Sequence, residues 1–380
     1  MFGYSKNLIF TSSILIGTIV GAGIFGIPYV VSRSGIIPGF FYLIFLGAAL
    51  LLIHLFYGEV ILRTKDRHHL PALAEKYLGK KGKVLITIST FVGMTGVLLA
   101  YTILGGEFLK IIFSSFTVVS SFHLSLFFLA SLSYFVFRGI KIIAPTELVT
   151  NFIFFSILFV IFFFALPEIN FNNFVLFNLP QSFLPYGVIL FSLIGFPAMP
   201  VVGGILNNPG DKKNLRAALT FSFIVVVLIY IIFVSVVVGV SGKGTSPETL
   251  QGLIPFFGPK IIIFGALAAI ITLVDSFLTI ALSFKNTMVY DYKISKLSAF
   301  IIACGLPLAL FLLGFRSFIG TIGFVGTIIG AIEGIAIILI FKNAKTKGDK
   351  EPEYKVNVSR FVLYLLIMVF VLGAVSQIFL

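Results

Sequence analysis

The sequence is poor in charged residues, has a single cysteine and contains no tryptophan. Only 11% of its 380 residues are charged, whereas soluble domains carry about 25%. Hydrophobic residues make up 59% of the chain, and the mean hydropathy is +1.13. These values exclude an ordinary soluble domain and indicate a protein that crosses a membrane several times. The lone Cys304 excludes an internal disulfide and a cysteine-based metal site.

Signatures of nucleotide-driven and metal-dependent chemistry are also absent. The sequence contains no G-x-x-x-x-G-K-[ST] element. None of its four histidines forms a His-x-x-x-His or Glu-x-x-His pair. Apolar runs such as residues 152–166 lack the alternation of outer-membrane β-strands. We therefore expect helices across the bilayer, no cofactor and no enzymatic activity.

Apolar windows predict eleven helical spans of about 20 residues each. Their bounds are near 8–32, 36–62, 84–112, 122–137, 146–166, 184–206, 217–241, 259–284, 297–314, 318–341 and 361–380. The longest polar stretch, residues 342–360, is charged and is predicted to be a solvated cytoplasmic linker. Because no segment outside the spans is long enough to bury its own core, we expect a single membrane domain over residues 1–380.

The 27 Lys and Arg residues are distributed unevenly among the loops. If the N-terminus is cytoplasmic, all but five lie on the cytoplasmic side; the exceptions are Arg33, Lys110, Lys243, Lys260 and Arg316. Basic residues favour that side, so we expect the N-terminus inside and the C-terminus outside a prokaryotic cytoplasmic membrane. The net charge of +13 then indicates contact with the anionic inner surface of the bilayer and not with nucleic acid.

Spans one and six differ from the others. Each has a glycine followed five residues later by a proline, Gly23 before Pro28 and Gly195 before Pro200. Both residue types interrupt helices, and interrupted helices at matching places in two halves indicate a transporter's central site. The alternative is that these small residues only allow close helix packing.

This pairing predicts an all-α polytopic fold built as a five-plus-five inverted repeat with broken helices one and six. The repeats would cover about residues 8–166 and 184–341, and an eleventh helix would follow at 361–380.

Four short stretches resemble those of one transporter superfamily. They are Gly17–Pro28, His54–Thr64 at the end of span two, Phe191–Phe196 in span six and Asp275–Leu278 in span eight. The first resembles the first-helix signature of the amino acid, polyamine and organocation transporters, especially their aromatic, hydroxy and neutral amino acid permease branches. The resemblance implies a secondary transporter of amino acids, neutral or aromatic ones, that works by alternating access around a midplane site.

The resemblance also implies which groups hold a zwitterionic substrate. Backbone N–H groups of the first break would bind its carboxylate, and carbonyls of both breaks would bind its ammonium. The carboxylate is assigned to Gly21, Ala22 and Gly23, and the ammonium to carbonyls near Ile19, Ser192 and Ile194. Phe191, close to Gly195, would cover the substrate or else pack in the core. Tyr101 would close the site or else bond to another helix.

Asp275 is the predicted centre of ion coupling. It lies near the middle of span eight, with no Lys or Arg in that span before Lys285. In sodium-coupled relatives, two hydroxyl residues at this place join carbonyls of span one around the ion. The matching residues here are Gly17, Val20, Thr272, Asp275 and Ser276. A carboxylate where a hydroxyl is usual leaves sodium binding, proton transfer and a purely structural hydrogen bond open.

Other ionisable residues in the spans have local explanations. Glu59 and Arg63 are spaced to form an ion pair. Glu107 would either pair with Lys110 or line an outer vestibule, and Glu333 would have either a functional or a structural role. The alternatives for the whole chain are an amino acid sensor with a transporter fold, or a transporter of another small amine such as a polyamine. The sequence makes no prediction about the oligomeric state.

Overall fold

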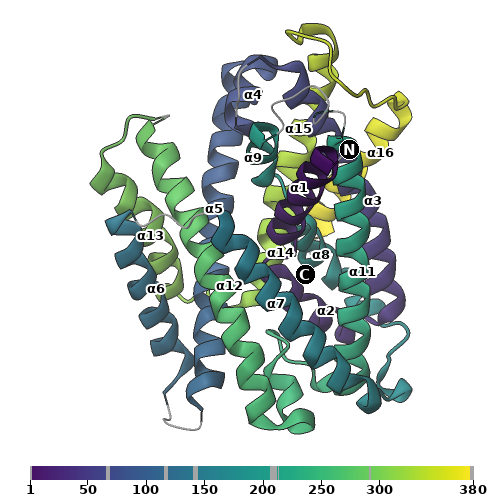
Figure 1. Ribbon diagram of the computed structural model, residues 1–380, viewed down its shortest axis with the longest axis vertical. Helices are drawn as coiled ribbons and strands as arrows, with labels where there is room; N and C mark the ends of the chain where they lie inside the picture. Colours follow the sequence, from purple (N-terminus) through teal and green to yellow (C-terminus); the bar gives the residue numbers. More distant parts are fainter. Residues whose placement is uncertain are drawn as a thin grey trace.

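The computed structural model describes residues 2–65, 69–114, 119–139, 144–205, 212, 214–290 and 292–376. The described chain is a helical bundle (Figure 1). Residues 377–380, at the end of the predicted eleventh helix, lie outside the described part.

The helices follow the predicted order of spans. Span one consists of α1 (Phe2–Val20), the 3-10 turn η1 (Ala22–Phe25) and α2 (Ile27–Ser34). Spans two to five are α3 (Ile36–Arg63), α5 (Lys80–Phe113), α6 (Ser121–Arg138) and α7 (Ala144–Ala165), with α4 (Leu70–Leu78) after span two. Span six consists of α8 (Leu184–Leu193) and α9 (Ala198–Ile205).

The remaining spans complete the second half. Spans seven to nine are α11 (Leu215–Ser241), α12 (Ile254–Tyr290) and α13 (Lys296–Leu312). Span ten consists of α14 (Phe318–Phe324), the π-helix η7 (Val325–Ile329) and α15 (Gly330–Lys347), and α16 (Arg360–Ser376) is the eleventh span. Short 3-10 turns lie in the connections: η2 (Leu166–Glu168), η3 (Phe171–Asn173), η4 (Leu179–Gln181), η5 (Gly242–Gly244) and η6 (Gln251–Leu253).

Most of the predicted crossings are long and apolar enough to span a membrane. Among the described residues, seven helices are long and apolar enough to cross a membrane, and an eighth is a bent pair, Thr11–Val20 with Ala22–Ser34, that turns by 42°. Three shorter apolar helices, Phe152–Glu168, Lys296–Leu312 and Arg360–Ser376, account for the other predicted spans.

Both predicted breaks are present. Gly21 ends α1 with a φ of 26°, a conformation that residues with a Cβ seldom adopt, and Pro28 lies in the first turn of α2. In span six the helix stops after Leu193 and resumes at Ala198. Pro197 separates the two pieces and has no N–H to continue the helix.

Glycines allow spans six and ten to touch. A Cβ on Gly326, in η7, would overlap the Gly187 carbonyl of α8 and lie 2.6 Å from the Phe191 nitrogen. A Cβ on Gly187 would in turn lie 2.6 Å from the Gly323 carbonyl oxygen. The first half of the broken span six, α8, therefore packs backbone to backbone against the irregular turn of span ten.

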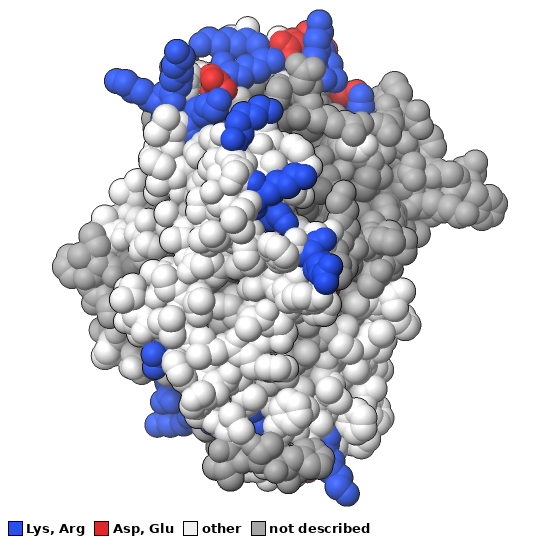
Figure 2. Space-filling model, turned by 90° about the vertical axis from the view of Figure 1, so that its left-hand side faces the viewer, with Lys and Arg blue, Asp and Glu red and all other residues white. Residues whose placement is uncertain are grey.

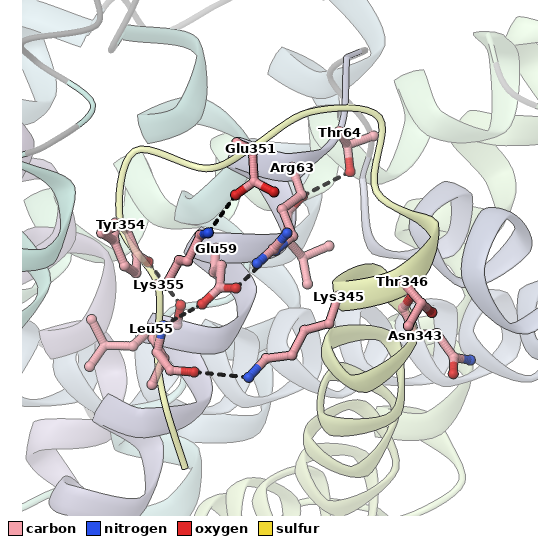
Figure 3. Close-up of polar contacts among 12 residues, drawn as sticks. Leu55, Glu59, Arg63, Thr64, Asn343, Lys345, Thr346, Glu351, Tyr354 and Lys355 are labelled. Atoms are coloured by element: carbon pink, nitrogen blue, oxygen red, sulfur yellow. Dashed lines mark hydrogen bonds and ion pairs between the residues drawn. The ribbon is translucent and has the colours of Figure 1, made fainter.

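The prediction of a solvated linker after span ten is wrong. α15 continues to Lys347, and residues 348–359, which we call the strap, lie against the end of α3 (Figure 3). Pro352 and Tyr354 are buried, whereas Glu351 and Lys355 on the alternate positions are exposed. This alternation of two residues indicates an extended segment with one packed face.

Polar contacts hold the strap in place. Glu59 is fully buried, pairs with Arg63 at 2.8 Å and accepts the Val356 N–H. The predicted Glu59–Arg63 pair is therefore present, and the strap satisfies the second carboxylate oxygen. The Tyr354 hydroxyl donates to the Leu55 carbonyl at 2.8 Å, and the Asp349 N–H donates to the Arg63 carbonyl at 2.9 Å.

One further ion pair anchors the start of the strap. Asp349 accepts from the Lys76 ammonium of α4 and from the Lys65 N–H. The hydrogen bond with Lys76 lowers the pKa of the Asp349 carboxyl. The strap thus connects α15, α3 and α4 at one end of the bundle.

We predict that Tyr354→Phe lowers the free energy of unfolding by about 1 kcal/mol, because the Leu55 carbonyl loses a buried partner. Thermal unfolding of the purified protein in detergent measures the change. Tyr364→Phe is the control, because that side chain is 64% exposed. Equal melting temperatures for the wild type and Tyr354→Phe would contradict the strap contact.

Candidate functional site

The two helix breaks meet at the hydroxyl of Tyr230. This side chain comes from α11 and is fully buried. Its oxygen lies 2.7 Å from the Ser192 carbonyl, 3.1 Å from the Ile19 carbonyl and 3.4 Å from the Val20 carbonyl. The structure therefore brings together Ile19 and Ser192, two of the residues predicted to hold an ammonium group.

Tyr230 was missed in the sequence, although a signal was present. It is the one polar side chain in the apolar run of residues 223–234. A phenolic hydroxyl buried at this depth must find a hydrogen-bond partner. The sequence alone does not show that the partners are the carbonyls of the two broken helices.

His54 of α3 supports the break in span six. The Gly195 N–H donates to His54 Nε2 at 3.1 Å, and His54 Nδ1 lies 2.8 Å from the Leu50 carbonyl. Because Gly195 supplies a proton to Nε2, the ring proton must be on Nδ1, where it is donated to Leu50. The imidazole is therefore neutral and fixed in one tautomer, and it lies against the Phe196 and Phe223 rings with centroids 4.8 Å away.

Gly23 allows the two breaks to approach each other. A Cβ at this position would lie 2.7 Å from the Ser192 Cα, which is closer than Cβ atoms come to other atoms. A side chain at Gly23 would therefore separate the broken helices, whatever the residue contributes to a substrate. Ala22 is buried beside it, and a Cβ on Gly21 would lie 3.9 Å from the Tyr101 hydroxyl. The assignment of the carboxylate to these three residues remains a prediction.

Tyr101 of α5 connects the first break to span eight. Its side chain is buried and interacts through its hydroxyl with Ser276 of α12. Gly21, Tyr101 and Ser276 are thus neighbours, from spans one, three and eight. Their convergence joins the predicted substrate residues to the predicted ion residues.

Phe191 and Ile194 lie against span ten. Phe191 is partly buried, and a Cβ on Gly326 of η7 would lie 2.9 Å from its own Cβ. A Cβ on Gly330 would lie 2.8 Å from Ile194 Cδ1. The role of Phe191 as a cover over the substrate therefore remains a prediction, with span ten packed beside it.

Asp275 is buried and has no cationic partner among the described residues. Its Oδ2 accepts from the Thr150 hydroxyl of α7 at 3.2 Å. Its Oδ1 is buried and has no hydrogen-bond partner in the described part of the chain. A buried carboxylate oxygen without a donor is costly, so this atom is the strongest indication of a site for a proton or a cation.

The structure assembles only part of the predicted ion site. The Thr272 hydroxyl donates to the Ala268 carbonyl of its own helix at 3.0 Å. The Gly17 carbonyl accepts the Gly21 N–H at 3.5 Å, and the Val20 carbonyl faces Tyr230. α12 packs against α5, α6, α7 and α13, whereas α1 packs mainly against α11 and α9. The five-residue shell therefore remains a prediction.

Two other carboxylates have contacts that the sequence left open. Glu333 accepts from the Thr90 hydroxyl of α5 at 3.2 Å. Glu107 forms no ion pair with Lys110 in the described structure; instead it lies near Glu248 of the loop between α11 and α12. Burial raises the pKa of Glu248, and the Glu107 charge acts in the same direction. Among the described residues, no three His, Cys, Asp or Glu side chains gather as a metal site.

Comparisons with known proteins give a consistent result. The profile of the tryptophan/tyrosine permease family matches residues 4–377. The chain is 24% identical over 348 residues to glutamine transporter 2 of Aliivibrio fischeri, covering 90% of this chain and 89% of that protein. It is 26% identical over 222 residues to tyrosine-specific transport system 1 of Haemophilus influenzae, covering 57% and 54% of the two chains.

A solved structure shares the fold. The crystal structure of MhsT in complex with L-phenylalanine superposes with a TM-score of 0.69 at 15% identity, covering 97% of this chain and 98% of that one. With the helix order and the two breaks, this similarity confirms the predicted fold class of a polytopic inverted repeat with an extra helix.

We predict that His54→Leu lowers the free energy of unfolding by about 1–3 kcal/mol, because it leaves the buried Gly195 N–H without an acceptor. His54→Gln keeps an acceptor and should lose less. Thermal unfolding of the two variants measures the difference. His123→Leu serves as the control because His123 is exposed. Equal losses for Leu and Gln at position 54 would show that ring packing, and not the hydrogen bond, is what matters.

Proposed function

This chain belongs to the tryptophan/tyrosine permease family, and we propose that it is a secondary transporter of neutral or aromatic amino acids. In this proposal it carries its substrate across the membrane by alternating access, and the movement is coupled to sodium ions or protons. The family and its relatives are amino acid transporters and not enzymes.

The convergence of the two broken helices carries this proposal. At this place α1 and α8 end with carbonyls directed to one point, and η1 begins at Ala22. The C-terminal end of a helix exposes carbonyl acceptors, and its N-terminal end exposes N–H donors. A zwitterion needs both, because its ammonium donates hydrogen bonds and its carboxylate accepts them. Backbone groups that both amino acid poles can use are thus available inside an apolar bundle.

The neutral surroundings of the breaks support a substrate with an uncharged side chain. The side chains placed there are Tyr101, Ser192, His54 and Tyr230, and the imidazole is neutral. A charged substrate side chain would have no opposite charge among these four residues. The Asp275 carboxylate, whose charge acts on Tyr101, is assigned to the coupling ion. The relatives named for glutamine and tyrosine, and the phenylalanine complex of MhsT, agree with this class.

Asp275 supports coupling to a cation. Its buried Oδ1 lacks a donor among the residues that the structure describes, and a lone carboxylate inside a membrane protein is stable only when a proton or a cation neutralises it. The oxygens of Asp275, Ser276 and Thr150 are hard ligands of the kind that sodium takes, and the same carboxylate can hold a proton. Both options follow from one buried acid.

The charge distribution supports the expected orientation of a single membrane domain. Figure 2 shows Lys and Arg side chains gathered toward the end of the bundle that bears α4, with a mostly uncharged surface below. The positive-inside rule assigns this basic end to the cytoplasm. The N-terminus is then inside and the C-terminus outside.

Uptake into proteoliposomes tests the function. The purified protein is reconstituted, and labelled L-tyrosine, L-phenylalanine, L-glutamine and a polyamine are offered separately under a sodium gradient and under a proton gradient. We expect accumulation of at least one amino acid under one of the gradients. Binding without uptake under either gradient would favour a sensor, and accumulation of a polyamine instead would favour the other alternative.

We predict that Asp275→Asn uncouples transport, because the amide keeps the shape of the side chain but neither carries a charge nor exchanges a proton. A tenfold ion gradient stores about 1.4 kcal/mol per ion and concentrates substrate about tenfold. The variant should equilibrate substrate to a ratio near one and still exchange it. Glu75→Gln, which changes an exposed pair with Lys83, is the control. Full accumulation by Asp275→Asn would remove Asp275 from the mechanism.

A further inference from the structure

The carbonyl cluster at the two breaks has more acceptors than its donor can satisfy. Three carbonyl oxygens, those of Ile19, Val20 and Ser192, lie within 3.4 Å of the Tyr230 oxygen. A phenolic hydroxyl carries one proton. It therefore makes one full hydrogen bond, to Ser192 at 2.7 Å, and leaves two acceptors at longer range.

Helix geometry and burial make this shortage significant. Ile19 and Val20 are the last two residues of α1, and Ser192 is the next to last of α8. The final carbonyls of a helix have no following N–H groups of their own helix to accept. All three residues are at most 3% exposed, so bulk water does not supply the missing donors.

A primary ammonium group matches the cluster better than the hydroxyl does. It carries three N–H donors and a positive charge, both of which suit three convergent carbonyls. The point occupied by the Tyr230 oxygen lies within hydrogen-bonding range of all three. An ammonium nitrogen placed there and the hydroxyl exclude each other by size.

We propose that the Tyr230 hydroxyl holds the place of the substrate's ammonium group in the empty transporter and is displaced when a primary amine binds. This inference rests on the proposed function, in which these carbonyls take the substrate's ammonium group, and it adds the residue that occupies them in the empty transporter. Tyr230 is then a positioning residue that keeps the acceptors of α1 and α8 together until the substrate arrives.

Displacement also links binding to helix contacts. Tyr230 belongs to α11, which packs against α1, α2 and α3. Its hydroxyl links α11 to the ends of both broken helices by hydrogen bonding. When the ammonium group takes the place of the Tyr230 hydroxyl, the link from α11 to the broken helices is lost, whereas α1 and α8 stay joined through the substrate.

The substitution Tyr230→Phe tests the proposal, because it removes the competing hydroxyl and keeps the ring. We expect the affinity for an amino acid to rise roughly three- to tenfold and the melting temperature of the empty protein to fall. The affinity for the same acid without its amino group should not rise, because that ligand does not use the carbonyls. Binding to the purified protein is measured with L-phenylalanine, L-tyrosine and L-glutamine and with their deaminated acids.

Tyr186→Phe is the matched control. Tyr186 also donates to a carbonyl of another helix, that of Val369 at 3.1 Å, but away from the breaks. This control should lower stability without changing amino acid affinity. If Tyr230→Phe does not fold, fluorine NMR of wild-type protein with 3-fluorotyrosine incorporated at position 230 replaces it. The resonance should shift with the amino acid and stay unchanged with the deaminated acid.

The outcomes separate this inference from the function on which it rests. Weaker or unchanged amino acid affinity in Tyr230→Phe would contradict the proposed displacement. Weaker affinity would mean that the hydroxyl binds the substrate, and unchanged affinity would mean that it only joins the helices. An equal gain for the deaminated acid, or an NMR shift caused by it, would also overturn the role of the ammonium. Failure of the wild-type protein to bind any of the three amino acids would remove the proposed function, and this inference with it.

Discussion

Backbone polar groups released inside an apolar bundle are the constraint on which this structure depends. A continuous helix satisfies its own N–H and C=O groups, whereas a broken one must find other partners at a depth that water and lipid do not serve. Tyr230 supplies a donor to the ends of α1 and α8, and His54 supplies an acceptor to Gly195 in the gap of span six. Without these two side chains, the backbone groups that they bond at the breaks would lose their partners and the bundle would be less stable. With them, the ends of both broken helices have hydrogen-bond partners inside the bundle.

The close approach of these breaks explains where small residues are needed. Gly23 lies against Ser192, and Gly326 lies against Gly187. A methyl group at Gly23 or Gly326 would separate spans whose backbones must touch. The packing interpretation of these glycines and the functional one are therefore compatible, because close packing is what brings the backbone groups of the two breaks together.

The sequence predicted the fold well because its signals are local. Paired glycine and proline motifs marked both breaks, and apolar runs marked the spans. The site was predictable only at the level of the helix breaks. The hydrogen-bond donor to the Ile19 and Ser192 carbonyls is Tyr230. It lies 38 residues beyond Ser192 in the chain, and no rule of sequence spacing links these residues. Likewise, the Gly195 acceptor comes from His54 of another span. The strap was missed for a different reason. Its charges indicated solvent, although Pro352, Tyr354 and Val356 alternate with the charged residues Glu353 and Lys355, a pattern that is typical of a segment with one packed face.

The strap also bears on how the bundle can open at its basic end. Here α3 of the first repeat is fastened to the chain that leaves α15 of the second, through Glu59, Arg63 and Tyr354, at the basic end of the bundle. Any movement that parts these two helices on that side must break those bonds. Opening of the bundle at its basic end therefore costs the free energy of the hydrogen bonds that the strap makes with α3.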